Sequence, residues 1–433
     1  MLVALIASGS AAAATFTVKS TGDASDSDWP DRPTDRRCDV DLATAGKQCT
    51  LRAAIQEANS TDRADTIEFD IPGGGVQTIT PGSKLPSIVL GRATINGYTQ
   101  PGATPNTVAD PTATNATIAI QITGQYAGLE FDDASGSVVK GLSIGGCNPD
   151  CGTRGIYLDN GGGYRVQGNF LGAAADGTTS APNYSGVTAG GTEGIRVGGG
   201  KPAARNLISG NRSLGVYLSN GVTDSLVKGN LIGLDRNGAP LGNGHAPLTG
   251  SAFGGVLLIG FGGNTFLSNA IYANGGLGIN LGGLPQDSNG VNPNDGDDPG
   301  TPSLDPDTDT GPNRRQNFPV LTGAQLFEDP FGDTALGGGT LDSVRSTRKR
   351  EEEYIIEFFV SPAQDASGYG EGRVPAGQIV VTTDDRGHAS FNFSVGGGVD
   401  EGDFITATAT RVRTGDTSEF SDAVVVQPPV IGP

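Results

Sequence analysis

The chain has 433 residues, of which 70 are Gly and 26 are Pro, and it carries 28 Lys and Arg against 47 Asp and Glu. Its glycine content is more than twice the roughly 7% of an average soluble protein, and each Gly inside a helix costs about 1 kcal/mol relative to Ala. A mainly helical fold is therefore excluded, and the lack of a Gly-X-Y period excludes collagen. The net charge of −19 disfavours nucleic acid and anionic lipid as partners.

The first residues, Met1–Ala14, form a short apolar stretch that ends in small residues. This pattern is typical of a signal peptide cleaved before Thr15, and an ordinary apolar first strand is the alternative. No other stretch is long and apolar enough to cross a membrane, which takes about 20 residues. We therefore expect a protein that is secreted or held at the cell surface.

Four cysteines fit export to an oxidising compartment. Of the three possible connectivities, the two local pairs Cys38–Cys49 and Cys147–Cys151 are favoured by their spacing. A zinc site is the alternative, but His245 and His388 lie far from these cysteines in the sequence. The sequence therefore predicts two disulfides.

One segment has the pattern of a helix. Thr50 can cap Leu51–Asn59, in which Leu51, Ala54, Ile55 and Ala58 share one face. Nearly everything after Asp65 consists of short strand-like runs and turns. We expect this helix to cap an otherwise all-β fold.

From about residue 128 a short unit recurs, in which Gly is followed by an apolar residue, any residue and another apolar residue. The unit begins at Gly128, Gly155, Gly194, Gly215, Gly255 and Gly278. Coils of about 20 residues with three- to four-residue strands are typical of a solenoid. Parallel strands that are joined by such short turns favour a right-handed β-helix. Long and short coils alternate, and the extra residues of the long coils fall in two loops, 173–193 and 234–254, which we expect to leave the same corner. These loops would either wall a groove over one face or be tolerated insertions without a role.

After the solenoid the sequence changes twice. An acidic, Pro-rich stretch comes first, and longer alternating strands follow it, as in a small antiparallel β-sandwich. The predicted organisation is a signal peptide (1–14), a parallel β-helix with an N-terminal cap (15–285), a linker (286–316), a β-sandwich (317–427) and a tail (428–433).

Several motifs together resemble one family. Cys49–Ile55 followed by Glu57–Asn59 looks like the CSLREA-type N-terminal segment of secreted bacterial parallel β-helix proteins. The same group is matched by Asp65–Phe69, Ile95–Pro101, Gly229–Gly233, Gln316–Val320, Ile405–Ala409 and Thr417–Phe420. The resemblance implies an extracellular, pectate-lyase-like β-helix with a C-terminal sandwich. It names no catalytic residue.

Strand alternation points the third residue of each repeated unit outward. The predicted outward row is Glu130, Tyr157, Arg196, Tyr217, Leu257 and Asn280, and Asp132 and Asp159 lie two places further on. Neighbouring coils are about 4.8 Å apart, so these groups would form one patch. The alternative is a charged, solvated sheet face without a ligand.

Two kinds of chemistry fit this patch. Tyr157, Tyr217 and Asn280 would bind sugars of an extended polysaccharide at the cell surface, without catalysis. Alternatively, Glu130, Asp132 and Asp159 would act with Arg196 in a Ca²⁺-assisted polysaccharide lyase, where the Arg removes the proton alpha to a uronate carboxyl. Two of the carboxylates could also serve a glycoside hydrolase.

A second acidic motif lies in the linker. Asp305, Asp307 and Asp309 alternate before Gly311, as carboxylates do in Ca²⁺ loops. An EF-hand would have Gly at the sixth place and Glu at the twelfth, so an acidic linker without a metal is the alternative. Ca²⁺ is the one cofactor that the sequence suggests, because Gly161–Gly163 lacks the helix and lysine of a nucleotide site.

Overall fold

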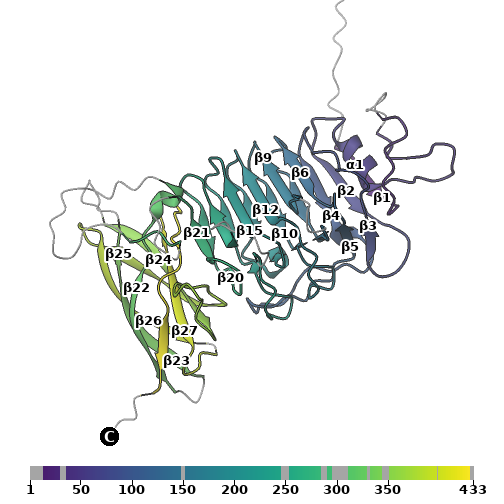
Figure 1. Cartoon of the computed structure of the whole chain (residues 1–433). Helices are drawn as coiled ribbons and strands as arrows, with labels where there is room; N and C mark the ends of the chain where they lie inside the picture. Colours follow the sequence, from purple (N-terminus) through teal and green to yellow (C-terminus); the bar gives the residue numbers. More distant parts are fainter. Residues whose placement is uncertain are drawn as a thin grey trace, which may run out of the picture.

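The computed structural model describes residues 13–29, 36–147, 152–244, 253–283, 290–294, 311–328, 332–343, 351–396 and 398–429. Two parts follow one another along the chain, a stack of short strands and a sheet of longer strands (Figure 1). The predicted signal peptide lies outside the described residues up to position 12, and so do Asp305, Asp307 and Asp309. The same holds for Cys151, so its pairing with Cys147 stays a prediction.

The stack of short strands is a parallel β-helix with three sheets. Sheet A consists of β1 (Thr15–Val18), β2 (Asp65–Phe69), β4 (Ala93–Asn96), β7 (Val138–Lys140), β10 (Arg165–Gln167), β13 (Arg196–Gly198), β16 (Leu226–Lys228) and β19 (Thr265–Leu267). Sheet B consists of β3 (Gln77–Ile79), β5 (Ile120–Thr123), β8 (Leu142–Gly145), β11 (Phe170–Leu171), β14 (Leu207–Ile208), β17 (Leu231–Ile232) and β20 (Ala270–Ile271). Sheet C consists of β6 (Leu129–Asp132), β9 (Ile156–Asp159), β12 (Ser185–Gly190), β15 (Leu214–Ser219), β18 (Gly254–Leu258) and β21 (Ile279–Leu281).

The core is built by stacking the same inward position of successive coils. In sheet A one column of buried apolar side chains runs in register along the axis: Ile67, Ile95, Val139, Val166, Val197, Val227 and Phe266. Branched apolar residues suit this stacking, because each side chain packs against the same position in the coil before it and the coil after it, each about 4.8 Å away. The repeated apolar positions of the sequence therefore become a continuous core.

Two ladders of buried asparagines hold the corners of the coils. The first consists of Asn169, Asn206, Asn230 and Asn269, and the second of Asn183, Asn211, Asn243 and Asn274. At each step the backbone N–H and the Nδ2 of one Asn both donate to the Oδ1 of the next. Asn230, for example, donates to Asn269 at 3.1 and 2.9 Å and also to the backbone oxygen of Val197 at 3.0 Å. The ladders thus satisfy corner groups that the sheets leave unpaired.

The N-terminal end of the solenoid is covered by the predicted helix. Helix α1 (Leu51–Ala58) is wholly buried, and the side chain of Thr50 caps it by accepting from the N–H of Ala53 at 3.0 Å. The guanidinium of Arg52 binds the carboxylate of Asp23 with two hydrogen bonds. The predicted disulfide Cys38–Cys49 is present, with 4.9 Å between its Cα atoms.

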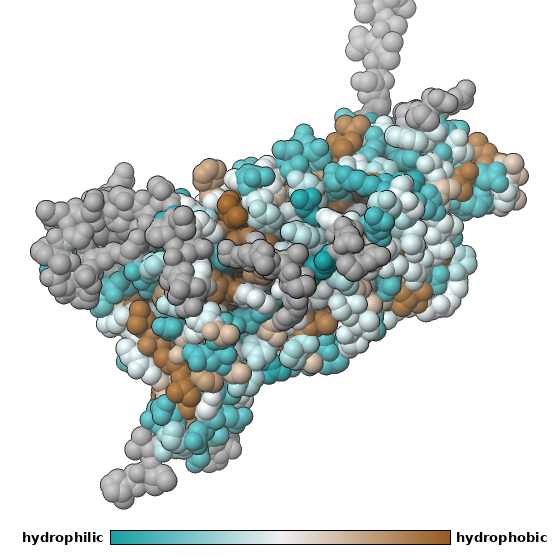
Figure 2. Space-filling model, in the orientation of Figure 1, coloured by the Kyte–Doolittle hydropathy of each residue, from teal (hydrophilic) through white to brown (hydrophobic). Residues whose placement is uncertain are grey.

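The C-terminal part is one mixed sheet of seven strands. In spatial order these are β25 (Val374–Thr383), β24 (Glu352–Ser361), β27 (Phe404–Arg411), β28 (Val424–Gln427), β22 (Val320–Phe327), β23 (Thr334–Asp342) and β26 (His388–Gly396). The end strands β25 and β26 contact each other, so the sheet curls into a near-barrel. The prediction of a small β domain is confirmed, but β28 pairs parallel with β22 and joins the two faces that a sandwich would separate. Figure 2 shows a run of hydrophobic side chains over this sheet.

Carboxylates of the C-terminal part accept hydrogen bonds from the last coil of the β-helix. Glu371 accepts from the N–H and Nδ2 of Asn274 at 3.1 and 2.7 Å, which puts its carboxylate in the place of the next asparagine of the second ladder. Glu357 likewise accepts from the N–H of Ser268 at 2.9 Å, and Glu419 from the N–H of Leu281 at 2.7 Å. We refer to Glu357, Glu371 and Glu419 as the capping carboxylates.

An aromatic plug closes the core between the capping carboxylates. Phe420 and Phe359 pack edge to face, with 5.1 Å between their ring centroids, and belong to the core cluster of the β-helix. Phe420 lies so close to Gly278 that a Cβ there would come within 2.9 Å of the ring. Glycine at this position therefore lets the plug approach the last coil.

The repeat is read correctly from the sequence except at one coil. Gly186-Val-Thr-Ala189 has the same pattern as the predicted unit at Gly194, and it is Val187 of β12 that pairs with Ile156 and Val216 in sheet C. The unit at Gly194 instead leads into β13 of sheet A. The predicted loop 173–193 thus contains a strand. Within the described residues no helix is long and apolar enough to span a membrane.

We expect Asn230→Ala to lower the free energy of unfolding by about 3 kcal/mol, because it removes the acceptor of the buried N–H and Nδ2 of Asn206 and the side-chain donor to the oxygen of Val197. Urea denaturation followed by circular dichroism measures the change. Asn237→Ala, in an exposed turn after β17, is the control and should change the free energy by less than about 0.5 kcal/mol. Equal stability of the two variants would contradict the structural role of the ladder.

A second prediction concerns pH. Burial raises the pKa of Glu371 to about 8 and that of Glu357 to about 6, from an ordinary value of 4.5. The folded chain therefore holds protons that the unfolded chain releases, so its stability should fall as the pH rises from about 4.5 to about 8. Glu371→Gln should reduce this fall above about pH 6, as measured by the melting temperature at intervals from pH 5 to 9.

The control for this experiment is Glu353→Gln, which removes an exposed carboxylate of β24, the strand that carries Glu357, and should keep the pH dependence of the unaltered chain. A melting temperature that rises through this interval would contradict the prediction. So would an unchanged slope in Glu371→Gln.

Candidate functional site

The outer face of sheet C carries most of the predicted site residues. In register along the axis, its outward row is Glu130, Tyr157, Thr188, Tyr217, Leu257 and Asn280. The strands are short and parallel, so each coil adds one outward side chain to the row. Five of the six predicted members are in place, and Thr188 stands where Arg196 is predicted.

The predicted place of Arg196 is wrong. Arg196 lies on β13 of sheet A, where its neighbour in register is Arg165. The cause is the misread coil, because Gly186 and not Gly194 starts the strand of sheet C. Arg196 therefore does not share a face with Glu130, Asp132 and Asp159.

Glu130 is held by two partners at the start of sheet C. Its carboxylate forms an ion pair with Lys84 at 2.6 Å and accepts a hydrogen bond from the hydroxyl of Ser87 at 2.8 Å. Ser87 is in position because Ile88 pairs with Phe131 and adds one further rung before β6. Both oxygens of Glu130 are thus engaged, which fixes the carboxylate at the edge of a pocket.

Asp132 and Asp159 lie side by side on neighbouring strands. They are directly paired in the register of β6 and β9, so their backbones are about 4.8 Å apart. The Nδ2 of Asn160 donates to Oδ1 of Asp132 at 2.8 Å, and Asn160 takes a left-handed φ of 50° in the turn after β9. The pair is the one predicted group of carboxylates that the register brings into direct opposition.

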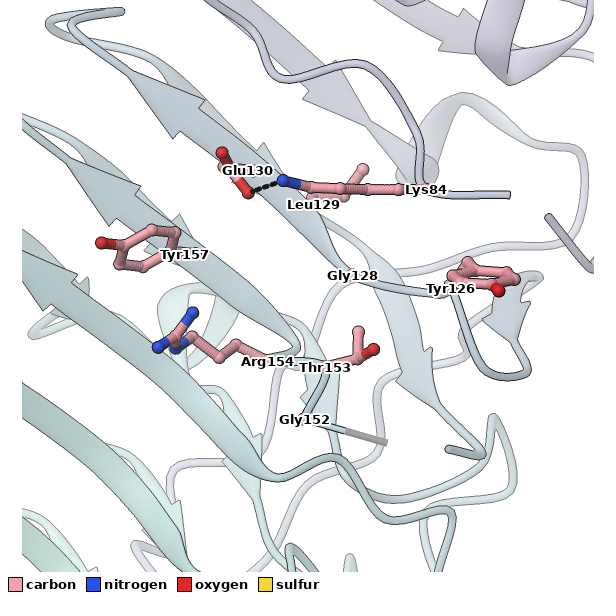
Figure 3. Close-up of a pocket in the computed structure, with 9 residues that line it drawn as sticks. All are labelled: Lys84, Tyr126, Gly128, Leu129, Glu130, Gly152, Thr153, Arg154 and Tyr157. Atoms are coloured by element: carbon pink, nitrogen blue, oxygen red, sulfur yellow. Dashed lines mark ion pairs between the residues drawn. The ribbon is translucent and has the colours of Figure 1, made fainter. Parts of the chain in front are cut away.

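A pocket of about 310 Å³ opens beside Glu130 (Figure 3). The guanidinium of Arg154 lies over the ring of Tyr157, 4.5 Å from its centroid, and the close-up shows Tyr126 at the opposite end of the pocket. Burial, and next the negative charge of Asp159, raises the pKa of Tyr157. The pocket therefore offers an aromatic surface, a cation and a carboxylate within one hollow.

Tyrosines continue along this face. Tyr126 and Tyr184 are 37% and 40% exposed, and Tyr217 lies two strands from Tyr157 in the outward row. The row becomes inaccessible at its far end, where Leu257 and Asn280 are each only 6% exposed. Thr188, between the two tyrosines, is only 2% exposed, so the accessible members of the row are Glu130, Tyr157 and Tyr217, on β6, β9 and β15.

The two long loops do not wall this face as predicted. In their described parts, Ala173, Ala175 and Leu241 pack with Phe170 and Leu207, which point outward from sheet B. The loops also contact each other, because the N–H of Arg236 donates to the oxygen of Gly177 at 3.0 Å. They leave the same corner but cover sheet B, because its outward side chains are apolar and need burial.

The sequence interpretation missed three residues of the pocket, Lys84, Tyr126 and Arg154, and one residue of the outward row, Thr188. Thr188 could have been found, because Gly186-Val-Thr-Ala189 shows the repeated pattern. Lys84 and Arg154 come from connecting segments, which carry no periodic signal. Among the described residues, no group of three or more His, Cys, Asp or Glu could hold a metal ion.

Comparison with known proteins gives only a distant likeness. The enzymatically active domain of tailspike protein 2 of bacteriophage CBA120 aligns with 87% of this chain and 67% of its own, at 13% identity and a TM-score of 0.24. Full-length tailspike protein 2 of an Escherichia coli O157:H7 bacteriophage aligns with 86% of this chain at 12% identity and a TM-score of 0.24, and only 60% of its length is spanned. No protein-family model matches the chain, and no curated protein matches it significantly. The parallel β-helix is assigned from the sheets of the chain itself.

Proposed function

We propose that this protein binds an extended polysaccharide along the outer face of sheet C, between β6 and β15. The observation that carries the proposal is the pocket in which Arg154 covers the ring of Tyr157 beside Glu130. Aromatic rings offer flat apolar surfaces to sugar rings, and the polar groups around them hydrogen-bond hydroxyls. An arginine at the rim also suits a sugar that carries a carboxylate.

The repeat of the solenoid supports an extended ligand rather than a compact one. Tyr157 and Tyr217 occupy the same outward position two strands apart, and thus about 10 Å apart along the axis. Tyr126 and Tyr184 lie beside this row on the segments that lead into β6 and β12. A chain of sugars lying along the axis would therefore meet a ring at repeated intervals.

Secretion is part of the same proposal. The disulfide Cys38–Cys49 fits an oxidising compartment, and the apolar N-terminal stretch and the CSLREA-like segment support export. Ca²⁺ at Asp305, Asp307 and Asp309 remains a proposal from the sequence alone. It predicts that adding EDTA to the full chain lowers its melting temperature, and an unchanged melting temperature would contradict it.

Binding should be tested by isothermal titration calorimetry with a panel of neutral and uronate-containing polysaccharides. For a polysaccharide that binds, we expect Tyr157→Ala and Arg154→Ala each to weaken the affinity about tenfold, which corresponds to about 1.4 kcal/mol. Arg386→Ala, which removes the same charge from an exposed turn of the C-terminal sheet, is the control. Lack of binding to every polysaccharide, or equal affinity of all variants, would contradict the proposal.

Cleavage of the bound chain is a second candidate, favoured by the opposition of Asp132 and Asp159. Retaining glycoside hydrolases hold their two carboxyl groups about 5 to 5.5 Å apart, and neighbouring parallel strands provide a similar spacing. In such a reaction one carboxyl group protonates the leaving oxygen while the other attacks the sugar carbon. Asn160 donates a hydrogen bond to Asp132, and Tyr157 is hydrogen-bonded to Asp159, so both carboxyl groups are held in position.

Release of reducing ends should then disappear, by at least about 100-fold, in Asp132→Asn and in Asp159→Asn. Ultraviolet absorbance of the same samples would reveal unsaturated ends and would identify the lyase reaction instead. The isosteric control is Asp133→Asn in the exposed turn after β6, which should retain the rate. No release of sugar from any substrate would leave binding as the function and would exclude cleavage of those substrates.

A further inference from the structure

The outer face of sheet A carries a second hollow, unrelated to the tyrosines of sheet C. Asn96, Lys140 and Gln167 are in register at the C-terminal edge of the sheet. The next position in this row is Gly198, which has no side chain. A pocket of about 390 Å³, which is within the size range of ligand sites, lies between this row and the turn that follows β13.

The walls of this pocket are held by contacts on both sides. The hydroxyl of Tyr98 donates to the oxygen of Gly168 at 2.6 Å and fixes the ring that forms one wall. The opposite wall is the short helix η2 (Pro202–Ala204), to whose Pro202 oxygen the Nδ2 of Asn106 donates at 3.2 Å. The side chain that follows η2, Arg205, donates to the oxygen of Val108 at 3.2 Å. The cavity is thus preformed, which lowers the entropic cost of binding.

The lining of this pocket is basic. Lys140 and Lys201 reach it, and no carboxylate is among its described lining residues. Arg165 and Arg196 occupy the neighbouring outward row of the same sheet. Glu68 of β2 is the register neighbour of Asn96 and lies two strands from Lys140. Glu193 and Asp224 line a separate hollow at the opposite edge of sheet A.

The charge of this edge contrasts with the rest of the molecule. With a net charge of −19, the chain repels anions at long range, so a site for an anion needs a local cluster of cations. Lys140, Arg165 and Arg196 lie on neighbouring strands, and with Lys201 in the turn after β13 they form such a cluster. The amide groups of Asn96 and Gln167 and the ring of Tyr98 add hydrogen-bonding and apolar surface of the kind that a sugar ring needs.

We propose that this pocket, which we name the lysine pocket, binds an anionic substituent, a carboxylate or a sulfate, of an acidic glycan. Lys140 and Lys201 would hold the anion, and Arg165 and Arg196 would contact the next charges of the same glycan across sheet A. The lysine pocket is a binding site distinct from the face of sheet C. It also gives Arg196 a role in binding, in place of the predicted role as a base.

The test measures affinity by calorimetry for three probes of equal length: oligogalacturonate, dextran sulfate and unmodified dextran. We expect at least one charged probe to bind more tightly than dextran, and to bind at least tenfold more weakly to Lys140→Gln/Lys201→Gln. Oligogalacturonate binding alone would identify a carboxylate, and dextran sulfate binding alone a sulfate. Raising the salt concentration from 50 to 300 mM should weaken this binding in the unaltered chain.

The control is Lys47→Gln/Arg386→Gln, which removes two exposed positive charges elsewhere and gives the same net charge. Equal affinity of the two double variants would mean that binding depends only on the net charge of the chain, and would overturn the proposal. Failure of the unaltered chain to bind either charged probe would also overturn it. Loss of binding in Arg154→Gln, with full binding in Lys140→Gln/Lys201→Gln, would overturn the lysine pocket and support the site on sheet C.

Discussion

The end of the solenoid is the constraint on which the rest of this structure depends. Each coil of a parallel β-helix satisfies its backbone groups on the next coil, so the last coil has donors and an apolar core without a partner. The capping carboxylates and Phe420 supply both needs from residues far along the chain. Without them, the asparagine ladders would end in unpaired donors, and the inward columns of apolar side chains would be exposed to water.

This solution carries an energetic cost. The capping carboxylates are buried, and burial of a charged group is unfavourable unless hydrogen bonds compensate. The donors of Asn274 and Ser268 compensate in part, yet the raised pKa values of Glu371 and Glu357 show that desolvation prevails. A glutamate nonetheless fits, because its oxygens accept both bonds that the last asparagine donates, whereas the Nδ2 of another asparagine would need a further acceptor.

The fold could be predicted from local patterns. Apolar positions at fixed distances from glycine indicate stacked coils, the spacing of Cys38 and Cys49 indicates their bond, and Thr50 marks the start of the helix. Each of these signals lies within a few residues of the structure that it predicts. The one misread coil, at Gly194, shows the limit of this approach, because two equal patterns eight residues apart compete and only the pairing with neighbouring coils selects Gly186.

The site was less accessible to prediction. Tyr157, Asp132 and Asp159 could be placed because they sit within the repeated units, whose orientation follows from strand alternation. Lys84 and Arg154 could not, since they reach the pocket from segments without periodicity. The capping carboxylates were also missed, because no sequence pattern relates Glu371 to Asn274, and their contact exists only after two distant parts dock.

The position of the aromatic plug in the chain has a consequence for biosynthesis. Phe420 follows the other groups that close the core in the chain, so a nascent solenoid keeps an open sheet edge until this residue has been made. Such an edge can pair with another chain, and a prematurely terminated product would carry it permanently. Closure of the core thus requires that the chain has been made as far as Phe420, because only then does the solenoid acquire a closed end.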